Sequence, residues 1–241
     1  MILKKYLITS GKGGTGKSTV AAGCAMALGH LGKRVLLADA DAGLRGLDLL
    51  LQMEESVAFD LGDVLAGRCD ADSALLAVPG FPSVFLLAGP ARTRDFCDPT
   101  SFRNLMTRLS EQFDFILIDG PAGFGTGFSV AAAGADAALV VALPDELSLR
   151  GAAKAAPELR EAGIEEAFLL VNRFPKKPRG CPGIDRMIDG TRLQLLGVVP
   201  EDARLLPGSR ETLADAKHPA AGAFSRLGRR LSGEHVPLVM P

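Results

Sequence analysis

The segment Gly11-Lys12-Gly13-Gly14-Thr15-Gly16-Lys17-Ser18 decides the fold of this chain, because its spacing is that of a phosphate-binding P-loop. Its glycines allow the backbone to turn tightly, so that several N–H groups point at one anion. Lys17 would supply a positive charge to the β- and γ-phosphates, and the Ser18 hydroxyl is placed to bind Mg²⁺. Lys12 is a second lysine that this cradle does not need. We therefore predict a nucleotide phosphate site, with Lys12 as its unusual feature.

The sequence on either side of this segment supports the same interpretation. Residues 5–9 form a short, largely apolar run that predicts a buried strand, and residues 19–28 predict an apolar helix. The N-terminus of that helix would add its dipole and its free N–H groups to the anion site. The alternative is a glycine-rich turn that binds no ligand. The strand–loop–helix context favours the phosphate site.

Length and composition narrow the class of protein further. The chain of 241 residues, 47% of them apolar, is long enough for one large α/β domain over residues 1–241. Its net charge of −1 argues against a strongly electrostatic nucleic-acid binder, so nucleic acid is not an expected partner. The N-terminus has no signal-peptide pattern, and no apolar run reaches transmembrane length. We therefore expect a cytoplasmic protein.

Short apolar runs alternate with helical stretches along the chain. Several runs are apolar at every position, which is typical of strands that are covered on both faces. The alternation predicts an α/β fold, a doubly wound, mostly parallel sheet flanked by helices on both faces. Ligand-binding residues should then gather at the carboxyl ends of the strands. Further predicted strands cover residues 34–38, 84–88, 113–118, 137–142, 167–171 and 195–199, and predicted helices include 98–111, 146–162 and 218–232.

Three aspartates follow predicted strands and are candidates for Mg²⁺ chemistry. Asp119 ends the apolar strand at 113–118, and the Gly120-Pro121 pair after it suits a loop that responds to the γ-phosphate. Asp39 and Asp41 follow the strand at 34–38, and residues two apart at a strand end point the same way. One of these two would hold a Mg²⁺-bound water, and the other would orient the attacking water. Ordinary turn or solvated loop aspartates are the alternative at each position.

Three motifs together resemble those of the deviant Walker A ATPases, and within that group those of the MinD family. They are Lys-Gly-Gly-Thr-Gly-Lys-Ser at 12–18, Asp-Ala-Asp-Ala-Gly-Leu-Arg-Gly-Leu-Asp at 39–48 and Asp-Gly-Pro-Ala-Gly at 119–123. The resemblance continues through Val-Asn-Arg-Phe at 171–174 and Gly-Val-Val-Pro-Glu-Asp at 197–202, so it covers nearly the whole chain. It implies an ATPase with ATP or ADP and Mg²⁺ as cofactors.

The resemblance implies that Lys12 acts in trans. It would reach across an ATP-dependent homodimer to the phosphates of the second copy, while Asp41 would help to activate the attacking water in its own subunit. Added positive charge stabilises the phosphoryl oxygens in the transition state. Hydrolysis would then depend on dimerisation, as suits a slow switch. The implied catalytic residues are Lys12, Lys17 and Asp41.

The other implied roles concern binding. The metal ligands would be Ser18, Asp39 and Asp119, and Asn172 would read the edge of the adenine. The segment Pro200-Glu201-Asp202 would flank the base. The implied nucleotide-binding residues are Gly11, Lys12, Gly13, Gly14, Thr15, Gly16, Lys17, Ser18, Thr19, Asn172, Arg173, Pro200, Glu201 and Asp202.

The chain also departs from the MinD pattern. Gly46 stands where MinD sequences usually carry asparagine, and Asp145 follows Leu143-Pro144 where an Asn-Pro-Glu-like run is expected. MinD proteins generally continue into a basic amphipathic helix that binds membrane, whereas this sequence stops at Pro241. Membrane binding, peripheral at the inner membrane face, is therefore left open. The apolar spacing within 218–232, with arginines around it, is that of a basic amphipathic helix that could lie on a membrane. The resemblance implies instead that this stretch is the family's last packed helix, docked on the core.

These observations favour a MinD-like ATPase that regulates division-site placement with a regulatory protein partner of the MinC or MinE kind. A flagellar-number regulator of the FlhG type is a related alternative that the sequence barely separates. An ATPase for metal-centre assembly is a second alternative, but its relatives usually show paired cysteines, and Cys97 and Cys181 are isolated. A DNA-partitioning ATPase of the ParA type is a third, and the near-neutral charge argues against it.

Overall fold

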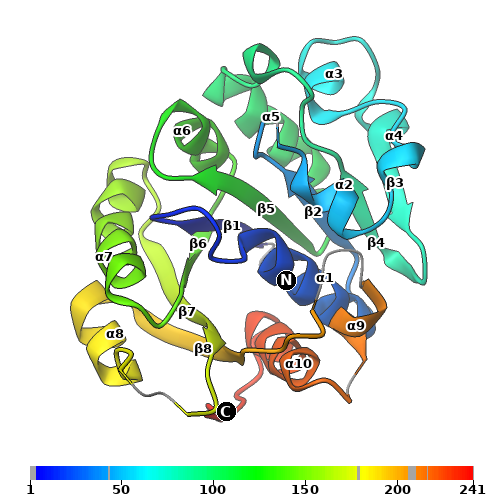
Figure 1. Ribbon diagram of the computed structural model, residues 1–241. Coiled ribbons are helices and arrows are strands. Elements are labelled where there is room, and N and C mark those ends of the chain that lie inside the picture. Colours follow the sequence, from blue (N-terminus) through cyan, green and yellow to red (C-terminus); the bar gives the residue numbers. More distant parts are fainter. Residues whose placement is uncertain (1–3, 43, 178–179, 206–209, 216, 241) are drawn as a thin grey trace.

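A computed structural model describes residues 4–42, 44–177, 180–205, 210–215 and 217–240. Its centre is a sheet in the order β3-β4-β2-β5-β1-β6-β7-β8, in which the only antiparallel pair among the described strands is β3–β4 (Figure 1). The prediction of a doubly wound, mostly parallel sheet is therefore confirmed. The strands are β1 (Lys4–Ser10), β2 (Val35–Asp39), β3 (Leu75–Val78), β4 (Phe81–Leu87), β5 (Phe115–Ala122), β6 (Ala137–Ala142), β7 (Glu166–Phe174) and β8 (Gln194–Pro200).

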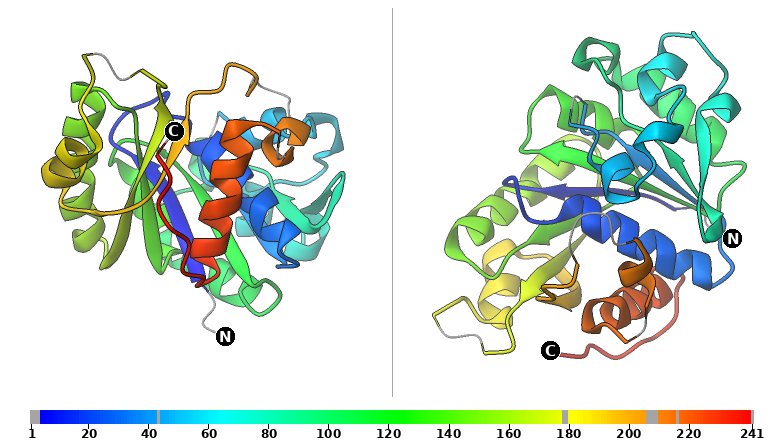
Figure 2. Two further views of the ribbon diagram at one scale, coloured as in Figure 1. Left: turned by 90° about the horizontal axis from the view of Figure 1, so that it is seen from below. Right: turned by 45° about the vertical axis from the view of Figure 1, so that its right-hand side comes forward.

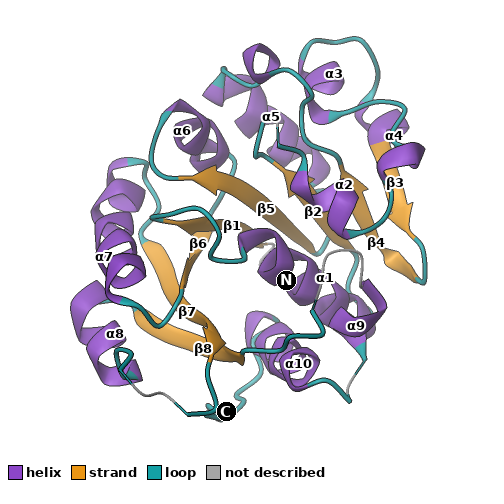
Figure 3. Ribbon diagram, in the orientation of Figure 1, coloured by secondary structure: helices purple, strands orange, loops and turns teal. Residues whose placement is uncertain are grey.

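Helices cover both faces of this sheet (Figures 2 and 3). The central strand β1 shows why, because Leu7 is buried in the core of one face while Ile8 is buried in the core of the other. The longer helices are α1 (Lys17–His30), α5 (Pro99–Leu109), α6 (Thr126–Ala133), α7 (Glu146–Glu161), α8 (Ile184–Thr191) and α10 (Pro219–Leu231). The shorter ones are α2 (Gly46–Leu50), α3 (Leu61–Leu65), α4 (Ala71–Ala74), α9 (Arg210–Ala214), η1 (Glu54–Ser56) and η2 (Thr93–Asp95).

The last helix, α10, packs on α1 and β8. Phe224, Leu227 and Leu231 are all buried there, so the apolar stripe expected from the sequence faces the core. Gly23 of α1 permits the close approach, since a Cβ at that position would lie 2.5 Å from the Phe224 ring. The prediction that this helix packs on the core is confirmed. Within the described residues no helix has both the length and the apolar character needed to span a bilayer.

Two features of the sheet differ from the sequence-based expectation. Asp119 lies inside β5 rather than at its end, because β1 continues to pair with β5 as far as Ser10 and Ala122, across an irregularity after Ile8. The predicted strand at 84–88 begins earlier, at Phe81, and forms a hairpin with β3 that was not predicted. The Pro79-Gly80 pair was the available signal, since Gly80 has a φ of 83° and proline followed by such a glycine suits a tight type II turn.

Candidate functional site

The P-loop connects β1, in the middle of the sheet, to the start of α1. Two of its glycines, Gly14 and Gly16, have φ angles of 76° and 87°, which side chains with a Cβ rarely adopt. The outer side of the loop is open, because a Cβ placed on Gly14 would meet no atom within 4 Å. The free N–H groups of the loop and of the first turn of α1 therefore form the expected anion cradle.

Asn172 supports this loop from β7. Its side-chain nitrogen donates a hydrogen bond of 2.8 Å to the carbonyl oxygen of Thr15, 157 residues away in the sequence. A Cβ on Gly16 would lie only 2.5 Å from the same nitrogen, so a larger residue here would displace the Asn172 side chain, and the φ of 87° also favours glycine. Asn172 thus has a structural task that the sequence analysis missed, and its predicted contact with adenine stays a prediction.

Two buried carboxylates stand side by side next to the loop. Asp39 of β2 and Asp119 of β5 are register partners, and both are almost completely buried. Burial, with the nearby charge of Asp39 as a second cause, raises the pKa of Asp119 from 3.8 to about 8. The Ser18 hydroxyl is hydrogen-bonded to Asp119, but Oδ1 of this carboxylate is buried and has no hydrogen-bond partner among the described residues. This donor set fits a divalent cation, which would satisfy the free oxygen and neutralise the charge.

Asp39 shapes the segment that follows it. One of its carboxylate oxygens accepts a hydrogen bond of 3.0 Å from the backbone N–H of Asp41, and the other accepts one of 3.1 Å from the N–H of Leu47. Burial raises the pKa of Asp39 to about 6, although these two hydrogen bonds oppose the rise. Through these two bonds Asp39 fixes the backbone N–H groups of Asp41 and Leu47, and its predicted role at the metal stays a prediction. Gly43 of that segment is outside the described residues.

Lys17 and Asp41 complete the charged cluster. Lys17 is buried, and its charge acts against the pKa rise at both Asp41 and Asp119. Asp41 is half-buried, and burial is the main reason why its pKa is raised. The structure therefore brings Lys17 together with Asp41 and Asp119, which lie 24 and 102 residues further along the sequence.

The residues predicted to surround the base line one pocket of about 210 Å³ beside the P-loop. Thr19 forms the side nearest the loop, while the rest comes from the ends of β7 and β8 and the loop after β8. Arg173 is exposed and has a φ of 52°, an uncommon value for arginine, at an irregularity in the β7–β8 pairing. The lining residues are Thr19, Asn172, Arg173, Pro200, Glu201, Asp202, Ala203 and Leu205.

Lys12 is held by a residue for which the sequence analysis predicted no contact. Its ammonium donates to both carboxylate oxygens of Asp145, at 3.2 and 3.1 Å. Asp145 is the N-cap residue of α7. Lys12 is thus engaged within its own chain, at the edge of the phosphate cradle.

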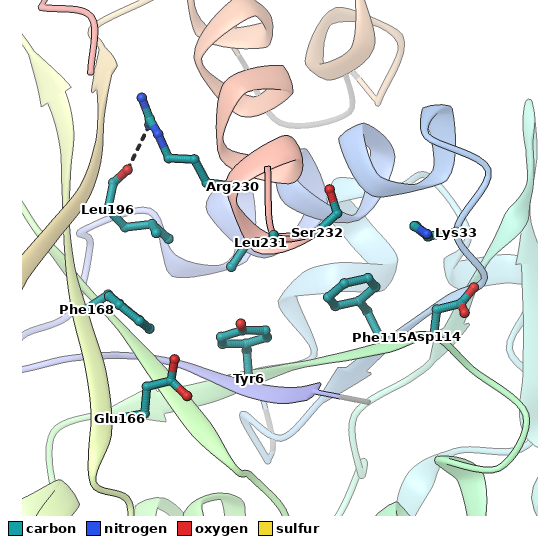
Figure 4. Close-up of a pocket in the computed structure, with 11 residues that line it drawn as sticks. Tyr6, Lys33, Asp114, Phe115, Glu166, Phe168, Leu196, Arg230, Leu231 and Ser232 are labelled. Atoms are coloured by element: carbon teal, nitrogen blue, oxygen red, sulfur yellow. Dashed lines mark hydrogen bonds between the residues drawn. The ribbon is translucent and has the colours of Figure 1, made fainter. Parts of the chain in front are cut away.

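A larger pocket, of about 350 Å³, lies at the opposite end of the sheet, where β1, β5 and β7 begin (Figure 4). Tyr6, Phe115 and Phe168 supply much of its wall, and Arg230 crosses it to donate to the carbonyl oxygen of Leu196 at 2.8 Å. It contains no glycine-rich loop and no start of a long helix. Its composition does not suit a phosphate group, so the nucleotide site is assigned to the P-loop edge.

A P-loop joins the central parallel strand β1 to a helix, and two buried carboxylates lie nearby on the neighbouring strands β2 and β5. These features define a P-loop nucleotide-binding protein of the doubly wound class. The family profile described as CobQ/CobB/MinD/ParA nucleotide binding domain matches residues 6–213. The chain belongs to this family.

Relatives that share most of its length include MinD proteins. The chain is 38% identical over 241 residues to the septum site-determining protein MinD of Bacillus subtilis, covering 96% of this chain and 90% of that protein. It is 35% identical over 247 residues to the MinD of Helicobacter pylori, covering 96% and 91% of the two chains.

Solved structures agree with these matches. MinD in the MinC:MinD complex of Aquifex aeolicus has a TM-score of 0.90 at 33% identity, covering 98% of both chains. MinD of Pyrococcus horikoshii, complexed with Mg-ADP, has a TM-score of 0.85 at 29% identity, covering 96% of this chain and 97% of that one. The resemblance seen in the motifs is therefore confirmed.

Proposed function

We propose that this protein is a MinD-type ATPase that takes part in division-site placement. ATP binding drives two copies into a dimer, and slow Mg²⁺-dependent hydrolysis resets it. The observation that carries the proposal is the P-loop with its second lysine, set beside the buried Asp39–Asp119 pair. The curated relatives that share most of this chain's length are septum site-determining proteins, which supports the cellular role.

The site fits a magnesium nucleotide. The unpartnered Oδ1 of Asp119 and the raised pKa of both buried carboxyl groups indicate that Lys17 alone does not offset the negative charge of this cluster. Ser18 and Asp119 would hold Mg²⁺, with Asp39 behind them. When bound, Mg²⁺ neutralises charge on the phosphate oxygens. The pocket lined by Arg173 and Glu201 is the place for the base.

The chain's own residues would divide the chemistry between binding and catalysis. The loop N–H groups and buried Lys17 would hold the phosphates, while half-buried Asp41 would orient the attacking water. Lys12 of one copy would stabilise the phosphates of the other. Because this cation would arrive only with the second copy, the monomer would hydrolyse ATP slowly.

A regulatory protein would read the ATP-bound dimer. The Aquifex aeolicus neighbour was solved as a MinC:MinD complex, and we propose a MinC-like partner for this chain. We also place the protein in the cytoplasm. Whether the dimer binds the inner membrane face is tested by co-sedimenting the protein with anionic liposomes in ATP or in ADP, where binding in ATP alone would support peripheral attachment.

Lys12→Ala provides the decisive test. Its ATP-dependent dimerisation, followed by sedimentation equilibrium, and its phosphate release should both be lost, whereas binding of ATP to the monomer should persist. Lys33→Ala is the matched control, because Lys33 lies beside the pocket at the opposite end of the sheet. If Lys12→Ala still dimerised and hydrolysed ATP like the wild type, the proposed mechanism would be wrong.

A further inference from the structure

The ion pair between Lys12 and Asp145 joins the nucleotide site to α7. Asp145 accepts from Lys12 at both of its oxygens, so two of the three ammonium donors are engaged within the same chain. The side chains are 27% and 42% exposed, so the pair lies at the protein surface and is accessible to a second copy. A lysine neutralised in this way is a poor source of positive charge for another molecule.

The carboxylate of Asp145 is held in position from its own side. Its Oδ1 accepts a hydrogen bond of 2.7 Å from the backbone N–H of Ser148, capping α7, and the Ser148 hydroxyl accepts one of 2.8 Å from the N–H of Leu143. These bonds fix both ends of the turn that leads into α7. Partial burial acts to raise the pKa of Asp145, but the hydrogen bonds from Ser148 and Lys12 outweigh it and keep this pKa below its usual value. Asp145 is therefore a preorganised anion.

The lysine is positioned just as firmly. The Ser10 hydroxyl donates a hydrogen bond of 2.7 Å to the carbonyl oxygen of Lys12. The preceding residue, Gly11, packs backbone to backbone against Gly151 of α7, where an added Cβ would lie 2.2 Å from the Gly151 carbonyl. This contact sets the distance between the loop and α7, so the two charged side chains meet without rearrangement.

We propose that Asp145 is a latch that holds Lys12 in cis and thereby raises the concentration of ATP-bound protein needed for dimerisation. The inference rests on the proposed function, because it concerns the lysine that would act in trans. For Lys12 to reach the phosphates of a second copy, its pairing with Asp145 must be released in both copies. Because Lys12 would act on the phosphates of the second copy, the latch opens when two ATP-bound copies meet.

The test uses Asp145→Asn and Asp145→Ser, which both remove the charge but keep an N-cap side chain for α7. Dimerisation of the full chain is measured by sedimentation equilibrium in Mg²⁺ and a non-hydrolysable ATP analogue. Formation of each dimer breaks two partly exposed Lys12–Asp145 ion pairs, one in each copy. Variants that lack these pairs should therefore dimerise with a dissociation constant about threefold to tenfold lower. Asp136→Asn is the matched control, since Asp136 forms an equivalent pair with Lys5 at the other end of β1, at 3.0 Å.

The outcomes separate the latch from the proposed function. Tighter dimerisation in both variants, unchanged dimerisation in Asp136→Asn, and no effect of Asp145→Asn in a Lys12→Ala background would support the latch. Unchanged or weaker dimerisation, with Lys12 still required, would overturn the latch alone and would indicate that Asp145 contacts the second copy or does nothing there. Failure of the wild type to dimerise with ATP would overturn both.

Discussion

The contact between Gly11 and Gly151 leads to a quantitative prediction about the P-loop. An alanine Cβ at residue 11 would lie 2.2 Å from backbone atoms of Gly151, whereas ordinary contacts begin at 3.4 Å. The neighbouring atoms are main chain on a helix that buries Leu149 and Ala152, so no flexible side chain can give way. Helix α7 would have to retreat from the loop by about 1 Å.

The cost follows from the kind of atoms that clash. Overpacking a well-packed site costs about 1–3 kcal/mol, and the backbone contact places Gly11→Ala at the upper end of that range, about 3 kcal/mol. Gly151→Ala should cost less than about 1 kcal/mol, because its Cβ would be 3.1 Å from Gly11 and alanine gains about 1 kcal/mol over glycine inside a helix. Gly13→Ala should leave stability unchanged, since its Cβ would meet only Ala122 at 4.0 Å.

Urea denaturation of the nucleotide-free protein measures these three free energies, and a fluorescent ATP analogue measures binding. Gly11→Ala should lose stability, whereas Gly13→Ala should keep stability but bind nucleotide more weakly, because it adds a methyl group to the loop that would wrap the phosphates. The reasoning is refuted if Gly11→Ala is as stable as the wild type, or if Gly151→Ala is the more damaging of the two.

Three further predictions concern other parts of the chain. Without Mg²⁺, stability in urea should fall as pH rises from about 4 to about 8, because the pKa of Asp119 is raised from 3.8 to about 8 and the native state keeps a proton that the unfolded state releases. Asp119→Asn should reduce this loss of stability with rising pH, and an equally steep loss in the variant would refute the prediction. Asn172→Ala should lower the free energy of unfolding by about 1–3 kcal/mol and weaken nucleotide binding, since the Thr15 carbonyl loses its donor; unchanged values in urea and ATP titrations would contradict this. Phe224→Ala should cost about 3–5 kcal/mol in urea while ATP affinity is retained, because this fully buried ring packs against Gly23 of α1 and does not line the base pocket; a variant that lost ATP binding would contradict this.

Much of the sheet could be predicted because its strands are apolar at nearly every position. β6, for example, is buried throughout, and a run of that kind is recognised without knowing its neighbours. The hairpin of β3 and β4 was missed in part because Pro79 and Pro82 interrupt the apolar sequence there, although Leu75–Val78 is itself apolar throughout. The position of Asp119 inside β5 was also missed, since the length of a strand depends on how far its partner continues.

The candidate site was predicted in its composition but not in its contacts. The P-loop residues, the three aspartates and the base-pocket residues lie together as expected. No sequence pattern indicated that Asn172 supports the Thr15 carbonyl or that Asp39 holds the N–H groups of Asp41 and Leu47. Each of these bonds depends on where a side chain meets a backbone atom from another element.

The sequence by itself determined the P-loop, the alternation of strands and helices, and the presence of a second lysine at residue 12. These properties follow from local spacing, because glycine positions and apolar periodicity set backbone conformation over a few residues. Only the tertiary structure decided that Lys12 is paired with Asp145, 133 residues away, and that Asp39 stands beside Asp119. Such partners are set by strand order and register, which no local pattern encodes. The lysine was visible in the sequence, but the residue that restrains it became visible only when the loop and α7 were brought together.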